Sequence, residues 1–299
     1  MMIIIITPSV NNTNPLRETV MSTCHINAPT QYVEIDADRF AYRRWGKKGG
    51  TPLLFIQHYR GGMDHWDPLM TDGLAEGREV ILFDGRGVAG SSGQPRNRFE
   101  AMADDIAALI EALGVRQVDI VGFSIGGFQA QEVALRHPKL VRKLILLGTG
   151  PRGGDPWIDP RMAEIAPKPV HDVEDFVFLF FGKSEQAKRA GRAFWDRRHQ
   201  RVIDEDPLSS PEVAHAHWDA YQAYMVPVGE KPYSHLAAIK QPTLIVNGIE
   251  DIMIASINSF YLAQNIPNSQ LILYPDAGHG SHFQYPERFL KHATQFLAE

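Results

Sequence analysis

Largely apolar runs that alternate with amphipathic segments limit the fold of this chain more than any other feature. Each run has the length of one strand, and such runs are typical of strands buried on both faces. The runs are Leu53–Ile56, Val80–Phe83, Val118–Val121, Leu144–Leu147, Thr243–Val246 and Leu271–Tyr274. The segments between them carry apolar residues at helical spacing; these are Ala101–Leu113, Gln129–His137, Ile257–Gln264 and Phe289–Leu297. The alternation predicts an α/β fold, a doubly wound, mostly parallel sheet with helices on both faces.

The alternation also suggests how the chain is divided. Two short antiparallel strands are expected at Gln31–Asp36 and Phe40–Arg44, and no buried strand is evident in residues 151–239. That stretch instead contains three plausible helices at Asp172–Phe181, Ser184–Asp204 and Pro211–Met225. We therefore predict a core of residues 31–150 and 240–299, a helical cap insertion at 151–239, and a disordered N-terminal extension at 1–30, of which the first twenty residues are dispensable.

Composition excludes several classes of function. The formal net charge of -5 does not favour nucleic acid as a partner. No run reaches the roughly 18 apolar residues that cross a membrane. One cysteine, Cys24, rules out a disulfide framework within the chain and zinc sites built on paired cysteines. We expect a cytoplasmic protein with a small-molecule substrate and leave its oligomeric state open.

The sequence Gly122-Phe123-Ser124-Ile125-Gly126 follows a predicted buried strand and precedes a predicted helix. A G-x-S-x-G segment in this position is the nucleophile elbow, which lifts a serine above the edge of the sheet. Glycines are needed there because the turn is tight and neighbouring chains pass close to it. Ser124 is therefore the predicted nucleophile.

A serine nucleophile needs a histidine base, and the base needs an orienting acid. Asp251 follows the predicted strand Thr243–Val246, and His279 lies in a glycine-rich loop after the last strand. The chain order serine, acid, histidine is the order expected in this arrangement. Glu250 and Asp276 are the alternative acids, and His282 is expected to help start the final helix instead of acting as the base.

These motifs resemble those of the alpha/beta-hydrolase fold superfamily, from about Gln31 to the C-terminus. The segment Phe83–Ser92 resembles the family's D-x-R-G-x-G-x-S loop with one extra residue between the glycines, and Gly278-His279 followed by Pro286-Glu287 resembles its histidine loop. The resemblance implies a triad of Ser124, Asp251 and His279. A serine at the elbow argues against branches of the family that use aspartate there, such as haloalkane dehalogenases and epoxide hydrolases.

The resemblance also implies an oxyanion hole. The family usually has a His-Gly pair before one donor, and Gln57-His58 stands at that place in this chain. The backbone N–H groups of Tyr59 and Ile125 are then the predicted donors. Because the family's glycine is missing, the sequence leaves open whether the His58 side chain enters the pocket.

The predicted function is a serine hydrolase that cleaves an ester, thioester or lactone of a small, fairly apolar molecule through an acyl-enzyme. A C–C bond hydrolase or a cofactor-free haloperoxidase or perhydrolase would use the same triad, and a non-catalytic ligand receptor is a further alternative. We predict no cofactor, and no metal at His58, His65, His279 and His282, whose spacing matches no ligand motif. Gly85–Gly90 has G-x-G-x-x-G form but precedes no helix, so we reject a dinucleotide site.

Other residues near these motifs are expected to be structural. Asp64 and Asp67 should cap the helix after Gly62, and Arg86 should donate hydrogen bonds within its loop. The aromatic residues of the insertion should mostly pack the cap on the core. Its basic residues should form a solvated helix face, and binding of an anionic substrate is the alternative; they are Lys188, Arg189, Arg192, Arg197, Arg198 and Arg201.

Overall fold

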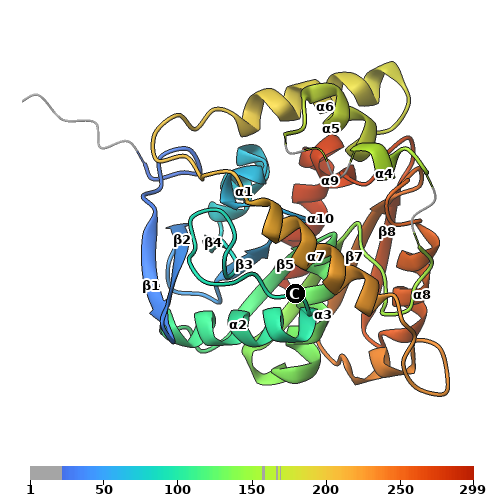
Figure 1. Ribbon diagram of the computed structural model, residues 1–299, viewed down its shortest axis with the longest axis horizontal. Helices are drawn as coiled ribbons and strands as arrows, with labels where there is room; N and C mark the ends of the chain where they lie inside the picture. The colour runs from blue at the N-terminus through green and yellow to red at the C-terminus, as the bar shows by residue number, and fades with distance from the viewer. Residues whose placement is uncertain (1–21, 157–158, 166–167, 169) are drawn as a thin grey trace, which may run out of the picture.

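A computed structural model describes residues 22–156, 159–165, 168 and 170–299. Its centre is an eight-stranded sheet with the order β1-β2-β4-β3-β5-β6-β7-β8 (Figure 1). The first two strands run antiparallel to their neighbours, and all pairings from β4 to β8 are parallel. The predicted α/β class and the mostly parallel sheet are confirmed.

All eight predicted strands are present, with ends that differ by a few residues. They are β1 (Gln31–Ile35), β2 (Asp38–Gly46), β3 (Leu53–Ile56), β4 (Glu79–Phe83), β5 (Val118–Phe123), β6 (Val141–Leu147), β7 (Thr243–Gly248) and β8 (Ser269–Tyr274). All residues of β3, β4, β5 and β7 are buried, as expected for strands with helices on both sides.

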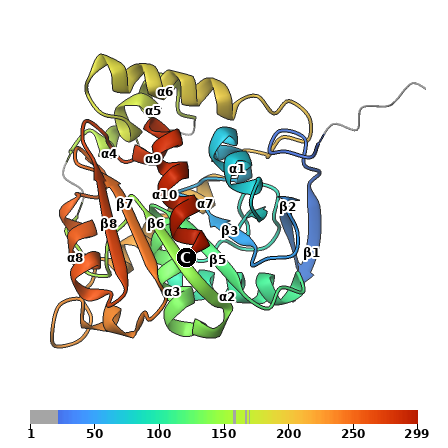
Figure 2. The ribbon, with the colours of Figure 1, turned by 180° about the vertical axis from the view of Figure 1, so that it is seen from behind.

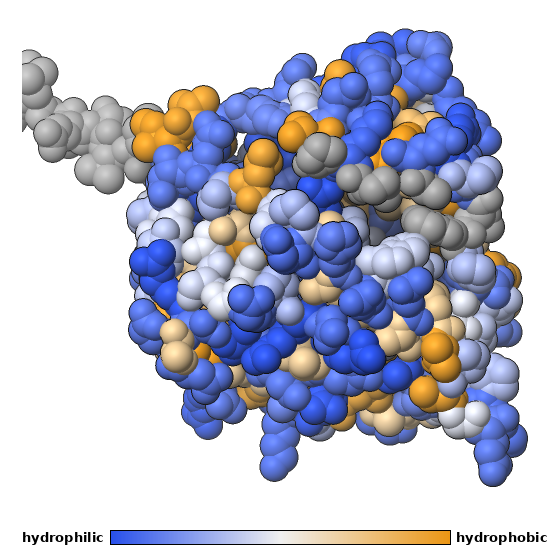
Figure 3. Space-filling view, viewed as in Figure 1, coloured by the Kyte–Doolittle hydropathy of each residue, from blue (hydrophilic) through white to orange (hydrophobic). Residues whose placement is uncertain are grey.

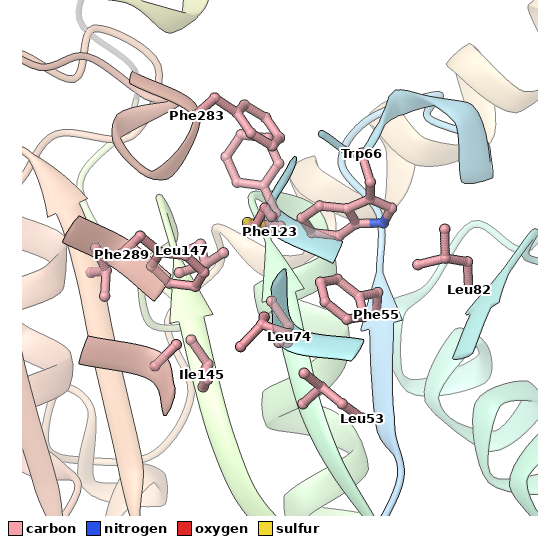
Figure 4. Packing of buried hydrophobic residues seen from close by; sticks show 14 of the residues in the cluster. Leu53, Phe55, Trp66, Leu74, Leu82, Phe123, Ile145, Leu147, Phe283 and Phe289 are labelled. Atoms are coloured by element: carbon pink, nitrogen blue, oxygen red, sulfur yellow. The ribbon is translucent and has the colours of Figure 1, made fainter. Parts of the chain in front are cut away.

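Successive side chains of these strands point to opposite faces of the sheet and build two cores. On one face, Phe55 and Val121 pack with α1 (Pro68–Ala75) and α10 (Pro286–Ala298), which lie together in Figure 2. Figure 4 shows Trp66, Phe123 and Phe283 grouped in the same core.

The opposite face is built from the alternate residues of the same strands. Leu54 and Ile120 pack there against three helices on the side turned toward the viewer in Figure 1. These helices are α2 (Phe99–Ala112), α3 (Ile125–Arg136) and α8 (Ile257–Asn265).

The chain between β6 and β7 is helical and contains no strand in its described residues. Its elements are α4 (Met162–Ile165), α5 (Val173–Phe180), α6 (Glu185–Arg198), α7 (Pro211–Tyr224) and the short 3-10 helix η3 (Ser234–Ala238). Helices α5 and α6 lie side by side at the top of Figure 1. The predicted helix Ser184–Asp204 is shorter than expected, because α6 ends at Arg198.

The structure tests only one part of the predicted disordered N-terminal extension. The prediction for the first twenty residues lies outside the described residues. The stretch 22–30 differs from the prediction of disorder, because it packs on the domain. The backbone N–H of His25 donates to Asp72, its ring contacts the Thr71 hydroxyl, and Arg201 donates to the carbonyls of His25 and Ala28.

In the part of the chain that the structure describes, no helix is long and apolar enough to cross a membrane. The face turned toward the viewer in Figure 3 is mostly hydrophilic, with hydrophobic residues in small groups. Side chains of this kind scattered over a surface are normal for a folded domain and need no partner to explain them.

Candidate active site

Ser124 stands between β5 and α3 in a strained backbone conformation. Its φ and ψ are 57° and -122°, outside the regions that most residues adopt. The glycines two residues before and after Ser124 cannot carry a side chain without a clash. A Cβ atom on Gly126 would lie 2.2 Å from the Ile56 carbonyl oxygen, and one on Gly122 would lie 2.4 Å from the Gly126 carbonyl oxygen. The strand, sharp turn and helix predicted for a nucleophile elbow are therefore present.

His279 and Asp251 meet although they lie on different loops. Nδ1 of His279 lies 2.8 Å from Oδ2 of Asp251, and neither side chain is exposed. The other carboxylate oxygen of Asp251 accepts hydrogen bonds from the backbone N–H groups of Met253 and Ile254. These bonds fix the carboxylate, which in turn orients the imidazole with its Nε2 atom away from the pair.

The alternative acids and the second histidine take other positions. Asp276 accepts a hydrogen bond of 2.6 Å from the Ser184 hydroxyl, and it is Asp251, the neighbour of Glu250, that lies against Nδ1 of His279. His282 is buried in the short helix α9 (Ser281–Gln284) and packs against Phe123, with ring centroids 4.5 Å apart. The expectation that His282 helps start the final helix is wrong, because α10 begins at Pro286.

Ser124 and His279 line one cavity of about 210 Å³. Nε2 of His279 is buried and has no hydrogen-bond partner among the described residues. The Ser124 hydroxyl therefore makes no hydrogen bond to His279 in this structure, and the imidazole atom that it would use is uncommitted. The walls of this cavity come from both the sheet edge and the inserted segment, so a substrate here would lie between the two.

The loop after β3 forms another wall. Tyr59 borders the cavity, and Ile125 is the first residue of α3, where an N–H group has no partner within its own helix. The Gln57 side chain holds this loop, because it accepts a hydrogen bond from the His58 N–H and donates one to the Gly62 carbonyl. One predicted oxyanion donor thus follows Ser124 directly in the chain, and the other belongs to a residue that lines the same cavity as Ser124.

The His58 side chain enters the cavity, which answers a question that the sequence left open. Its Nδ1 lies 2.9 Å from the Tyr59 carbonyl oxygen, so Nδ1 carries the proton and Nε2 is a buried acceptor without a partner. Burial, together with the nearby charge of Arg198, lowers the pKa of His58 to about 3. The ring is therefore neutral at physiological pH.

His65 also borders the cavity and was not predicted to belong to a site. Its Nδ1 accepts a hydrogen bond of 3.1 Å from the Gly62 N–H, which places the ring proton on Nε2. Burial holds the pKa of His65 well below its usual range. No local pattern identifies His58 or His65 as cavity residues, since their position depends on how the loop after β3 folds.

The inserted segment supplies much of the apolar wall, including Phe176, Phe180 and Trp195. Phe176 and Phe180 also belong to the main core, as expected for aromatic residues that pack this segment on the sheet. The prediction that the basic residues of the inserted segment form a solvated helix face is wrong for two of them. Arg198 and Arg201 are buried, and Arg198 lines the cavity.

The residues expected to be structural gave two corrections. Asp67 caps α1 by accepting from the Leu69 N–H, as expected, but Arg86 donates outside its own loop, to Asp105 in α2. Asp64 does not cap a helix, because it forms an ion pair with the buried Arg43. Within the described ranges, no group of three or more histidine, cysteine or acidic side chains could hold a metal ion.

Comparison with known proteins points to one family. The model of a family described as alpha/beta hydrolase fold matches residues 51–286. A 2-hydroxymuconate semialdehyde hydrolase of Pseudomonas putida is 29% identical over 294 residues, covering 92% of this chain and 98% of that protein. A solved alpha/beta hydrolase fold protein from Chitinophaga pinensis is 36% identical with a TM-score of 0.85, covering 92% and 99%. Est816, an N-acyl homoserine lactone degrading enzyme, is 26% identical with a TM-score of 0.70, covering 89% and 100%.

Proposed function

The chain belongs to the alpha/beta hydrolase family, and from this premise we propose that it is a serine hydrolase acting on an ester, thioester or lactone of a small, largely apolar molecule. The observation that carries the proposal is the buried contact between His279 and Asp251, with the free Nε2 of His279 in the cavity that Ser124 lines. The relative named as a lactone-degrading enzyme supports the choice of substrate class.

In the proposed mechanism, Nε2 of His279 removes the hydroxyl proton of Ser124 as the serine oxygen attacks the substrate carbonyl. Asp251 holds the proton on Nδ1 and stabilises the imidazolium that forms. The N–H groups of Tyr59 and Ile125 stabilise the tetrahedral oxyanion, and one such donor commonly contributes about 10²–10³ in rate. His279 then returns the proton to the leaving group, and water hydrolyses the acyl-enzyme.

Helices α5 and α6 act as a cap in this proposal. Their aromatic side chains close the cavity opposite the sheet edge, which excludes bulk water from the reacting atoms. The remaining walls come from the loops that carry Ser124 and His279, so the substrate would lie between the insertion and the core.

The test is pre-steady-state hydrolysis of p-nitrophenyl acetate by the wild type and Ser124→Ala. The proposal predicts a burst of one p-nitrophenol per chain in the wild type and no turnover above background in the variant, with thermal unfolding unchanged. Ser259→Ala is a suitable control, because this buried serine in α8 lies outside the cavity. Turnover by Ser124→Ala at the wild-type rate would refute the assignment.

A second candidate function is C–C bond hydrolysis by the same residues. The relative from Pseudomonas putida, named as a semialdehyde hydrolase, favours it by its match over most of both chains. Parallel assays with lactones, ring-cleavage products of catechols, and acetate with hydrogen peroxide would separate ester hydrolysis from C–C hydrolysis and from perhydrolase activity. The substrate with the highest kcat/KM decides between them.

A further inference from the structure

Arg198, the last residue of α6, presents an unpaired charge to the cavity that contains Ser124 and His279. The residue is 9% exposed, and its Nε and Nη1 atoms are buried without hydrogen-bond partners among the described residues. Its guanidinium packs on aromatic rings instead, 4.5 Å from the centroid of Phe176 and 5.3 Å from that of Trp195. Such contacts orient a cation but do not satisfy its N–H groups.

No carboxylate of the described protein is available to Arg198. Asp64 is the acid whose charge acts on it, but Asp64 forms an ion pair with Arg43 and lies 3.9 Å from Arg201. Burial lowers the pKa of Arg198 to about 10, so the group remains charged at physiological pH. A buried charge without a hydrogen-bonded partner is costly, so an anionic ligand that supplied the partner would remove this cost.

The rest of the cavity suits an anion. Its described lining contains no aspartate or glutamate. His58 and His65 are held neutral by burial, and the proton of His65 lies on Nε2, which makes it a further donor. A negatively charged group would therefore meet the cations Arg60 and Arg198 and neutral rings, without a repelling carboxylate in the described lining.

We propose that the substrate carries a carboxylate group and that Arg198 binds it, an inference that rests on the proposed hydrolase function. The planar guanidinium offers two parallel N–H donors, which match the two oxygens of a carboxylate. The Phe176 ring under Arg198 stacks on Phe180, and Phe180 contacts His279 with centroids 5.6 Å apart. Two aromatic rings thus separate the anion site from the catalytic imidazole, so the carboxylate lies at the far end of the substrate from the bond that breaks.

The test compares two p-nitrophenyl esters. One is the hemiglutarate, and the other replaces its free carboxylate with an isopropyl group of similar shape. The measured quantity is the ratio of kcat/KM for the anionic ester to that for the neutral ester, corrected for spontaneous hydrolysis. Because a hydrogen-bonded charge pair changes binding by about tenfold or more, the ratio should fall at least tenfold in Arg198→Gln. It should fall less in Arg198→Lys, which keeps the charge.

Arg192→Gln is the matched control, because Arg192 is an exposed residue of the same helix paired with Glu174. Its ratio should equal that of the wild type. An equal ratio in wild type and Arg198→Gln, with both esters hydrolysed, would overturn the inference and leave the hydrolase function standing.

Calorimetric titration with glutarate and inorganic phosphate tests the anion site without turnover. Wild-type protein should bind glutarate in preference to phosphate, and Arg198→Gln should lose this binding. If neither ester is hydrolysed, the hydrolase proposal fails while the titration still decides on the anion site. Tighter binding of phosphate, or no binding of glutarate, would overturn the assignment of a carboxylate.

Discussion

Nδ1 of His279 and Oδ2 of Asp251 lie 2.8 Å apart in a place that solvent does not reach. In water such a pair contributes little, but a buried carboxylate with fixed hydrogen bonds controls which imidazole nitrogen carries the proton. The Met253 and Ile254 N–H groups hold the carboxylate in place. The geometry therefore favours the tautomer in which Nε2 can accept a proton from Ser124.

Asp251→Asn should lower kcat for ester hydrolysis by about 10³–10⁴ without unfolding the protein. The amide keeps the shape but can donate to Nδ1, which shifts the imidazole proton to Nε2 and removes the base. Steady-state kinetics with a chromogenic ester measure the effect, and thermal unfolding confirms the fold.

Glu250→Gln is the matched control for the choice of acid, since Glu250 was the neighbouring alternative. Its kcat should stay within about threefold of the wild type. If Glu250→Gln lost more activity than Asp251→Asn, the assignment of the two acids would have to be reversed.

Gly126→Ala should destabilise the protein and slow the reaction. The added methyl group would lie 2.2 Å from the Ile56 carbonyl oxygen and 2.6 Å from that of Gln57, so the elbow and the loop after β3 must move apart. Overpacking of this kind costs about 1–3 kcal/mol. Because Ile125 and Tyr59 belong to the two displaced segments, kcat should also fall.

Gly77→Ala provides the comparison for this prediction. A Cβ at Gly77 meets nothing within 4 Å. Urea unfolding should show a change within about 0.5 kcal/mol for this variant, and kcat should be that of the wild type. Equal stability of Gly126→Ala and Gly77→Ala would contradict the steric argument.

The sheet was predictable because its signals are local. Runs such as Leu53–Ile56 and Leu144–Leu147 need burial on both faces, and only a sheet covered by helices provides it. The start of α3 was missed by four residues. Its first turn contains Gly126 and Gly127, which weaken helical periodicity, and the helix begins there because the elbow requires it.

The contacts of charged side chains were less predictable. From the sequence, Arg43 is expected to be a solvent-facing polar residue of a strand. In the structure it is buried and forms ion pairs with Asp64 and Asp206, which lie on other segments of the chain. Arg198 has the spacing of an exposed helix residue, and its burial follows from where α6 lies on the core. Local patterns indicate which face of a helix is polar, but not which polar residue another segment covers.

The folded protein should lose stability as the pH falls below about 6.5. Burial lowers the pKa of His25 to about 3 and that of His58 to about 3. Between these values and the ordinary 6.5, the unfolded chain takes up protons that the folded chain does not, which favours unfolding at lower pH. Each histidine contributes a slope of up to about 1.4 kcal/mol per pH unit.

Urea unfolding at a series of pH values from 7 to 5 tests this linkage. His25 lies away from the cavity. In His25→Gln, the slope of the unfolding free energy against pH should decrease by up to about 1.4 kcal/mol per pH unit, the contribution of one proton. His215→Gln, at an exposed position of α7, should leave the slope unchanged. Identical slopes in wild type and His25→Gln would show that His25 takes up protons in the folded protein as it does in the unfolded chain, which would contradict the prediction.

Arg197 joins α6 to α1, and its removal should destabilise the protein more than the loss of an exposed ion pair. Arg197 donates from Nε and Nη2 to both oxygens of Asp67, whose side chain is fully buried. Arg197→Gln leaves Asp67 with the Leu69 N–H but without a cation. Charge-assisted hydrogen bonds to a buried group contribute about 2–3 kcal/mol.

The control variant is Arg192→Gln, whose partner Glu174 is largely exposed. Because water screens this pair, its loss should cost less than about 1 kcal/mol. Urea unfolding of both variants at one pH and one salt concentration measures the difference. Raising the salt concentration should reduce the loss of unfolding free energy in Arg192→Gln. It should hardly change the loss in Arg197→Gln, since a buried pair is screened little. Equal costs for the two variants would mean that Asp67 finds another partner when Arg197 is lost and that α6 is held on the core by its apolar contacts alone.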